Sequence, residues 1–160
     1  MGYRLAMRDT DLFQLALGLS SPWKVTRCAF EVDGGQLDLY VDFPRGSRFA
    51  CPDCGREGCK VHDTSDDTWR HLGFFWRRTQ PHARTPRVTC ADCGVRKVAV
   101  PWARAGSGFT LLFEAYVLAP AKAMLIANAA KRLGEHDTRL WRIVEHYVGG
   151  LKIEVQHPAV

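Results

Sequence analysis

The sequence lacks any run of about 18 consecutive apolar residues, the length that a membrane-spanning helix requires. Residues 1–11 also lack the apolar stretch of a secretory signal, so we expect a soluble protein of the cytoplasm with no membrane partner. A strong excess of one charge is missing too, because 22 Lys and Arg residues face 17 Asp and Glu residues. With 46% apolar and 24% charged residues, the composition argues against wholesale disorder. A chain of 160 residues is too short for a large catalytic domain with accessory domains.

The net charge of +5 is concentrated in the middle third of the chain. Residues 1–50 are neutral overall, whereas residues 51–108 carry ten basic and six acidic side chains. Most of the basic residues are arginines, whose planar guanidinium suits phosphates and guanine edges. An ordinary solvated surface explains such a modest excess equally well, so charge alone assigns no partner.

Four of the six cysteines form two short motifs of one pattern at residues 51–55 and 90–94, which we call the knuckles. We do not expect disulfides in a reducing compartment. Two residues between cysteines let both sulfur atoms face one metal, and the glycine after each pair lets the backbone turn sharply. Four thiolates form the tetrahedral set that structural zinc favours. We therefore predict zinc as the cofactor, bound by Cys51, Cys54, Cys90 and Cys93.

The remaining cysteines are less suited to bind metal. Cys59 and His62 lie among the 35 residues between Cys54 and Cys90, but four cysteines already fill the site. We interpret Cys28 as a small buried residue of a strand. Four thiolates around a divalent ion carry a charge of −2, so some nearby arginines are expected to neutralise the metal site.

The pattern up to residue 100 predicts one helix and antiparallel strands. The helix begins with Asp9 as its N-cap and ends at Gly18. A hairpin of residues 23–32 and 36–43 turns at residues 33–35. Between the knuckles we expect strands at residues 69–76 and 83–89, separated by a turn at residues 77–81, and a last strand at residues 95–100.

From Gly106 onward, apolar residues recur at about every 3.6 positions, which predicts helices. We expect a helix at residues 110–118 that is broken near Pro120, a second at residues 121–133 that ends at Gly134, and a third capped by Asp137 or Thr138. The third helix is predicted to bury one face and expose Arg139, Arg142 and His146 in one row. Its predicted buried residues are Leu140, Trp141, Val144, Tyr147 and Val148. This order fits a helix-turn-helix, and a generic small bundle fits equally well.

The predicted fold class is therefore α+β, with an antiparallel β zinc ribbon followed by a small three-helix helix-turn-helix module. We divide the chain into an N-terminal helix and hairpin (1–50), a zinc ribbon with a long insert (51–105), a helix-turn-helix (106–148) and a divergent tail (149–160).

A collinear series of unusual peptides covers nearly the whole chain. It consists of residues 12–19, 22–23, 42–46, 51–55, 61–64, 68–72, 82–84, 90–94, 101–104, 106–110 and 134–142. This series resembles the N-terminal region of the ISL-three family of insertion-sequence transposases. The resemblance implies a ribbon and a helix-turn-helix that recognise the terminal inverted repeats of a mobile element.

In that family a catalytic domain of the RNase H-like type follows, with three carboxylates around two divalent metals. Because this sequence ends at Val160, where such a domain should begin, the resemblance implies a DNA-binding fragment without catalytic residues. We expect Asp63, Asp66 and Asp67 to be solvated residues of a loop. The expected partners are double-stranded DNA and either a second copy of the chain or an intact transposase.

For DNA binding we expect Arg139 and Arg142, helped by His146, to contact base edges or flanking phosphates. The arginines between the knuckles should add phosphate contacts that set affinity without reading sequence. They are Arg70, Arg77, Arg78, Arg84 and Arg87.

Two other functions fit the same residues. One is a stand-alone zinc-ribbon regulator that binds DNA. The other is an RNA-binding or protein-docking ribbon in which Trp69, Phe74, Phe75 and Trp76 act as base-stacking platforms, unless these rings form the core of the sheet.

Overall fold

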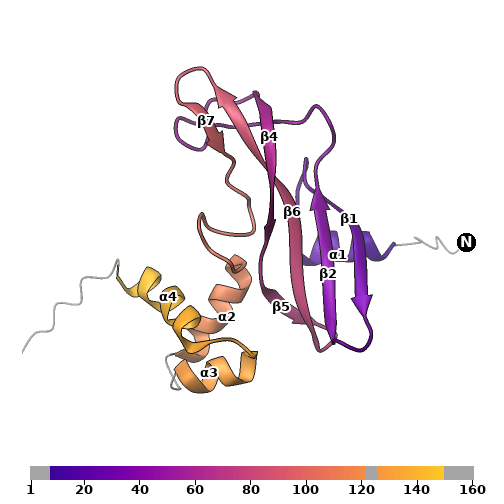
Figure 1. Cartoon of the computed structure of the whole chain (residues 1–160), viewed down its shortest axis with the longest axis vertical. Coiled ribbons are helices and arrows are strands. Elements are labelled where there is room, and N and C mark those ends of the chain that lie inside the picture. Colours follow the sequence, from indigo (N-terminus) through magenta and orange to yellow (C-terminus); the bar gives the residue numbers. More distant parts are fainter. Residues whose placement is uncertain (1–7, 122–125, 150–160) are drawn as a thin grey trace, which may run out of the picture. The chain divides into compact units, whose positions relative to one another are not determined.

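The computed structural model describes residues 8–121 and 126–149 and divides the chain into two compact units after Phe113. The first unit, Met1–Phe113, is a helix with a seven-stranded, mostly antiparallel sheet (Figure 1). Its elements are α1 (Asp9–Ala16), β1 (Lys24–Glu31), β2 (Gln36–Asp42), β3 (Arg48–Phe49), β4 (Cys59–Thr68), β5 (His71–Phe74), β6 (Arg77–Cys90) and β7 (Gly94–Lys97).

The long strand β6 organises the sheet, whose main order is β1-β2-β6-β4-β3, and β5 and β7 also pair with β6. Figure 1 shows β6 between β2 and β4. All pairs are antiparallel except β2 with β6, which run parallel, for example with Val41 opposite Ala83. The strand pairs within the predicted ribbon, residues 51–105, are antiparallel, and the parallel pair joins β6 to the N-terminal hairpin, a pairing that the sequence did not predict. Both β2 and β6 lead into a knuckle, so they must run in the same direction for the knuckles to meet.

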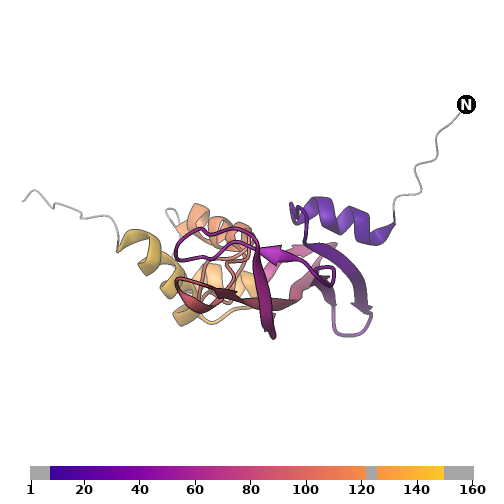
Figure 2. The same cartoon turned by 90° about the horizontal axis from the view of Figure 1, so that it is seen from above.

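Helix α1 lies against β1, as Figure 2 shows from above. The side chain of Gln14 ties the helix to the strand, because its Oε1 accepts a hydrogen bond from Val25 N and its Nε2 donates to Trp23 O. The helix ends before Gly18, at a φ of +64°, as predicted. The N-cap is Arg8 and not Asp9, and its backbone N–H donates to the Asp11 carboxylate at 3.1 Å.

The hairpin of β1 and β2 is confirmed, whereas two predictions between the knuckles are wrong. Residues 77–81 begin β6 and do not form a turn, and the turn consists of Phe75 and Trp76 instead. Asp63, Asp66 and Asp67 lie on β4 and not in a loop. Strand β4 escaped prediction because polar residues occupy both of its faces, so it has no alternation of apolar and polar side chains.

Aromatic rings form much of the core of the first unit. Trp23 contacts Trp102 edge to face with ring centroids 4.9 Å apart, and Trp102 contacts Trp69 at 5.5 Å. Backbone hydrogen bonds from Arg70 N to Gly108 O and from Thr110 N to Arg70 O hold the segment after β7 beside the sheet. Trp69 is thus a core residue, while Phe75 and Trp76 are exposed.

The division between the units falls within α2 (Leu111–Ala121), and the second unit continues with α3 (Ile126–Leu133) and α4 (Asp137–Val148). Helix α2 runs past Pro120 to Ala121, so the predicted break at this proline is wrong. Residues 122–125 of the predicted second helix lie outside the described residues. Gly134 ends α3 at a φ of +64°, as predicted. None of the helices in the described ranges combines the length and the hydropathy of a membrane span.

The start and the buried face of α4 differ from the prediction. Its N-cap is His136 and neither Asp137 nor Thr138. Leu140 and Ile143 are fully buried, whereas Trp141 is 50% exposed. The prediction omitted Ile143 and was wrong for three residues that are exposed, namely Trp141, Tyr147 and Val148. Half of the residues of this helix are apolar, so its neighbours and not its periodicity decide which are buried.

Candidate metal centre and nucleic-acid interface

The knuckles bring together the four cysteines that the sequence singles out. The Sγ atoms of Cys51, Cys54, Cys90 and Cys93 all lie within 4.8 Å of one another. Cys54 Sγ and Cys90 Sγ are 3.6 Å apart. Tetrahedral zinc with bonds of about 2.3 Å places its sulfur ligands roughly 3.8 Å apart, so the four residues fit this ion. Among the described residues no other group of His, Cys, Asp and Glu is arranged to hold a metal, and the cluster indicates metal binding.

The backbone of each knuckle explains its glycine. Gly55 and Gly94 have φ angles of +73° and +76°, a left-handed conformation that residues with a Cβ rarely adopt. Gly55 N donates to Cys51 O at 2.9 Å, and Cys51 N donates to Arg56 O at 2.9 Å, which closes the first turn. The second knuckle joins β6 to β7, with Cys90 opposite Gly94. These turns point both sulfur atoms of each pair toward the common site.

The thiols affect one another's ionisation because they are crowded. Backbone N–H groups of Asp92 and Cys93 lower the pKa of Cys90 to about 6. The hydrogen bond with Cys54, followed by burial, raises the pKa of Cys93 to about 12. Four neighbouring thiolates repel one another, so they ionise together only when a cation supplies compensating charge. A divalent metal at the cluster would supply that charge.

Two ion pairs connect the knuckles reciprocally. Arg56, just after the first knuckle, pairs with Asp92 in the second, and Arg96, just after the second, pairs with Asp53 in the first. The side chains are about half exposed, so water screens both pairs and each adds little to stability. These pairs were not predicted from the sequence, although the Asp of each motif and the arginine after it were visible signals.

The other candidate ligands lie outside the cluster. Cys59 is buried, its Sγ donates to Arg56 O at 3.3 Å, and burial raises the pKa of its thiol. His62 is exposed on β4. Cys28 is half-buried on β1 and packs against the core. None of the three is in the group that could hold a metal.

The five arginines between the knuckles lie in different environments. Arg84 forms a two-pronged ion pair with Asp42, and Arg87 forms one with Asp63. Arg77 donates from Nη1 to Glu31 O at 2.8 Å, and Arg78 is exposed. The guanidinium of Arg70 lies 5.7 Å from the ring centroid of Phe113, and its Nε and Nη1 are buried. This placement does not favour a phosphate contact from Arg70.

On α4, the row of Arg139, Arg142 and His146 is only partly open. Arg142 and His146 are exposed. Arg139 is half-buried and forms an ion pair with Glu135, whose side chain is only 2% exposed. Arg142, one and a half turns after the start of the helix, is therefore the exposed arginine of the row.

Comparisons with known proteins agree with a cysteine-bearing ribbon that is followed by a helical segment. The model of the zinc-finger of transposase IS204/IS1001/IS1096/IS1165 matches residues 47–93. The model of the helix-turn-helix domain of transposase family ISL3 matches residues 98–148. The chain therefore carries the zinc ribbon and the helix-turn-helix of ISL3-family transposases, as the resemblance implied.

Two curated relatives match the chain, each described as a transposase for insertion sequence element IS1557 and each from a strain of Mycobacterium tuberculosis (CDC 1551 / Oshkosh and H37Rv). Each is 32% identical over 113 residues, which is 68% of this chain and 26% of the relative. The match thus spans about a quarter of the length of these relatives. No solved structure gives a significant match.

Proposed function

We propose that this chain, which carries both N-terminal modules of an ISL3-family transposase, binds double-stranded DNA and recognises the terminal inverted repeats of an insertion sequence. The observation that carries the proposal is α4, because it follows a tight Gly134 turn and exposes Arg142 within the segment that matches the helix-turn-helix model. A recognition helix presents its first turns to the major groove in this way.

In this proposal the side chains of α4 read the sequence. Arg142 contacts base edges or flanking phosphates, and His146, one turn further along the same row, assists it. Arg139 joins them only if it exchanges its ion pair with Glu135 for a contact with DNA. We therefore assign the larger share of discrimination to Arg142.

Arginines of the first unit contribute affinity without specificity. Arg78 is exposed. Arg84 and Arg87 neutralise Asp42 and Asp63. A phosphate competes with these carboxylates, so each paired arginine releases fewer counterions than an unpaired one. Arg84 and Arg87 therefore contribute less to the salt dependence of DNA affinity than two arginines without carboxylate partners would.

Fluorescence anisotropy with element-end, unrelated and single-stranded probes over a range of salt concentrations tests the proposal. Arg142→Ala should relax sequence preference, at about 1–3 kcal/mol if the contact is bidentate to a base. Arg78→Ala should weaken all duplexes equally and lower the salt slope by about one. Arg8→Ala, a matched change at the exposed arginine that caps α1, should alter neither. Unchanged binding in all three variants would mean that the arginines only solvate the surface.

We also propose that these 160 residues do not cut or join DNA by themselves. Among the described residues the cysteine cluster is the only group arranged for a metal, and no set of carboxylates is placed for two-metal chemistry. Nicking of element-end DNA that depends on magnesium or manganese would overturn this. A second copy of the chain or an intact transposase is the proposed protein partner, which co-purification with tagged full-length transposase would test.

The same binding assays also bear on two other functions. A stand-alone regulator has the same binding activity and differs only in its role, for example by competing for the ends of the parent element. An RNA-binding ribbon is favoured by the β5–β6 turn, where Phe75 is 63% exposed and Trp76 fully exposed, because exposed rings stack on unpaired bases. Tighter binding of single-stranded RNA than of duplex DNA would select that function.

A further inference from the structure

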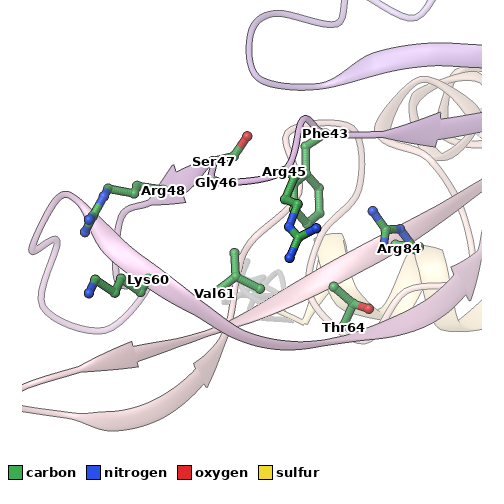
Figure 3. A pocket seen from close by; sticks show the side chains of 9 residues that line it. All are labelled: Phe43, Arg45, Gly46, Ser47, Arg48, Lys60, Val61, Thr64 and Arg84. Carbon is green, nitrogen blue, oxygen red and sulfur yellow. The ribbon is translucent and has the colours of Figure 1, made fainter.

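A basic pocket with a volume of about 580 Å³ lies on the first unit between the end of β2, strands β3 and β4, and β6 (Figure 3). Four of its nine lining residues are cationic, and no acidic side chain is among these described residues. Figure 3 shows Arg48 and Lys60 together at one end, Arg84 at the other and Arg45 between them. The lining consists of Phe43, Arg45, Gly46, Ser47, Arg48, Lys60, Val61, Thr64 and Arg84.

Strand pairing places two of these cations directly opposite each other. In the antiparallel pair of β3 and β4, Arg48 is the register partner of Lys60. Like charges at such positions repel and destabilise the pair unless an anion lies between them. Arg48 is also fixed in place, because its Nη1 donates to Gly58 O at 2.9 Å.

A tight turn presents the third cation. Gly46 has a φ of +86°, and both the backbone N and the Oγ of Ser47 donate to Pro44 O, at 3.1 and 2.6 Å. This turn holds Arg45 at the rim of the pocket, where it is exposed. Across the pocket, Arg84 is already paired with Asp42. Within the described ranges, no carboxylate pairs with Arg45, Arg48 or Lys60.

We propose that Arg45, Arg48 and Lys60 bind the phosphodiester backbone of duplex DNA, in an inference that rests on the function proposed above. Three cations, two from the turn and strand of residues 45–49 and one from β4, surround one hollow, which suits an anion shared by several donors. The only aromatic lining residue, Phe43, is 8% exposed and has no open face on which a base could stack. The pocket therefore holds backbone phosphate and reads no base.

An alternative explanation is that the cations protect an edge of the sheet. Strand β3 lies at the end of the main strand order, and cationic side chains on edge strands prevent pairing with other chains. That explanation predicts association of the protein when the cations are removed, with DNA binding per chain unaltered. The phosphate proposal predicts the reverse.

The test uses the zinc-loaded full chain and the variant Arg45→Gln/Lys60→Gln, with Lys24→Gln as a matched control at an exposed lysine on β1 outside the pocket. Circular dichroism and zinc content establish that the variants are folded. Anisotropy is measured with an element-end duplex, an unrelated duplex and single-stranded RNA. For each phosphate that the variant no longer binds, we expect about eightfold weaker binding to both duplexes near 0.1 M salt and a salt slope smaller by about 0.9.

The possible outcomes are distinct. Equal decreases in affinity for both duplexes, with an unchanged specificity ratio, a monomeric variant and an unaffected Lys24→Gln control, support the proposal. Wild-type binding with no change in the double variant overturns this inference alone, as does association of the variant without a decrease in affinity. Competition by millimolar inorganic phosphate at constant ionic strength overturns it in favour of a free-anion site, and preference for RNA overturns the assignment to duplex DNA. If the wild type binds no duplex at all, the proposed function fails first.

Discussion

Acidification should destabilise the first unit through one buried histidine, His71. This residue is 2% exposed, and its Nδ1 lies 2.7 Å from Thr110 Oγ1. The Thr110 hydroxyl also accepts a hydrogen bond from Phe113 N at 3.3 Å, so its own hydrogen is free to point at Nδ1. This arrangement suits a neutral imidazole. Burial, with a smaller effect from Arg70, lowers the pKa of His71 from 6.5 to about 4.

The size of the effect follows from the two pKa values. Because the folded-state pKa is lower than the unfolded one, the unfolded chain takes up the proton first as the pH falls. The stability is therefore complete above about pH 6.5 and decreases between that pH and about 4. The loss attributable to His71 is about 2 kcal/mol at pH 5 and about 3 kcal/mol near pH 4.

Denaturant unfolding of the zinc-loaded protein at several pH values between 7.5 and 4.5 measures this loss. The cysteine site also releases metal in acid, so wild type must be compared with His71→Gln, in which the thiolate contribution is the same. The variant should start less stable and show a shallower decline with pH. If its curve runs parallel to that of the wild type, His71 does not titrate as argued. An NMR titration of wild-type His71, with a midpoint near 6.5 instead of about 4, would also refute the reasoning.

Two further predictions concern the knuckles and the β5–β6 turn. Serine at any of the four clustered cysteines should remove the metal and unfold the ribbon, whereas Cys28→Ser or Cys59→Ser should keep one zinc per chain by elemental analysis. Cooperative unfolding of metal-free wild type would contradict this. At the turn, Trp76 is fully exposed with a φ of +61°, so Trp76→Gly should be more stable than Trp76→Ala by about 1 kcal/mol in thermal or urea unfolding. Equal stability of the two variants would show that the turn is not strained.

Local spacing explains why the metal cluster could be predicted from sequence and much of the sheet could not. The ligand set depends on two short motifs whose backbone turns are specified by Gly55 and Gly94. By contrast, β4 carries polar residues on both faces, and two of its acidic side chains pair with cations, Asp63 with Arg87 and Asp67 with Lys97. Those pairs connect residues 24 and 30 positions apart, a separation that no local pattern reveals.

For the candidate DNA-binding residues too, local sequence patterns do not reveal which side chains form ion pairs in the folded chain. Periodicity placed Arg142 correctly on an exposed face of α4, but it could not show that Arg139 pairs with Glu135. The basic pocket was invisible for a different reason. Arg45 and Arg48 belong to a segment without net charge, and only strand pairing brings Lys60 opposite Arg48. A count of net charge along the sequence therefore does not reveal this basic cluster, whose members come together only in the folded structure.

The metal site and the basic pocket are structurally coupled, because the first knuckle connects the two strands that carry Arg48 and Lys60. The pair of β3 and β4 joins only two residues of each strand, Arg48 with Lys60 and Phe49 with Cys59. A ladder this short does not persist on its own. The first knuckle lies between the two strands, and its Cys51 follows Phe49 by two residues. Metal binding at the knuckle thus holds Arg48 and Lys60 opposite each other against their repulsion. If both proposals hold, removal of the metal abolishes the phosphate contacts of this pocket, and the four thiolates control DNA affinity without touching DNA.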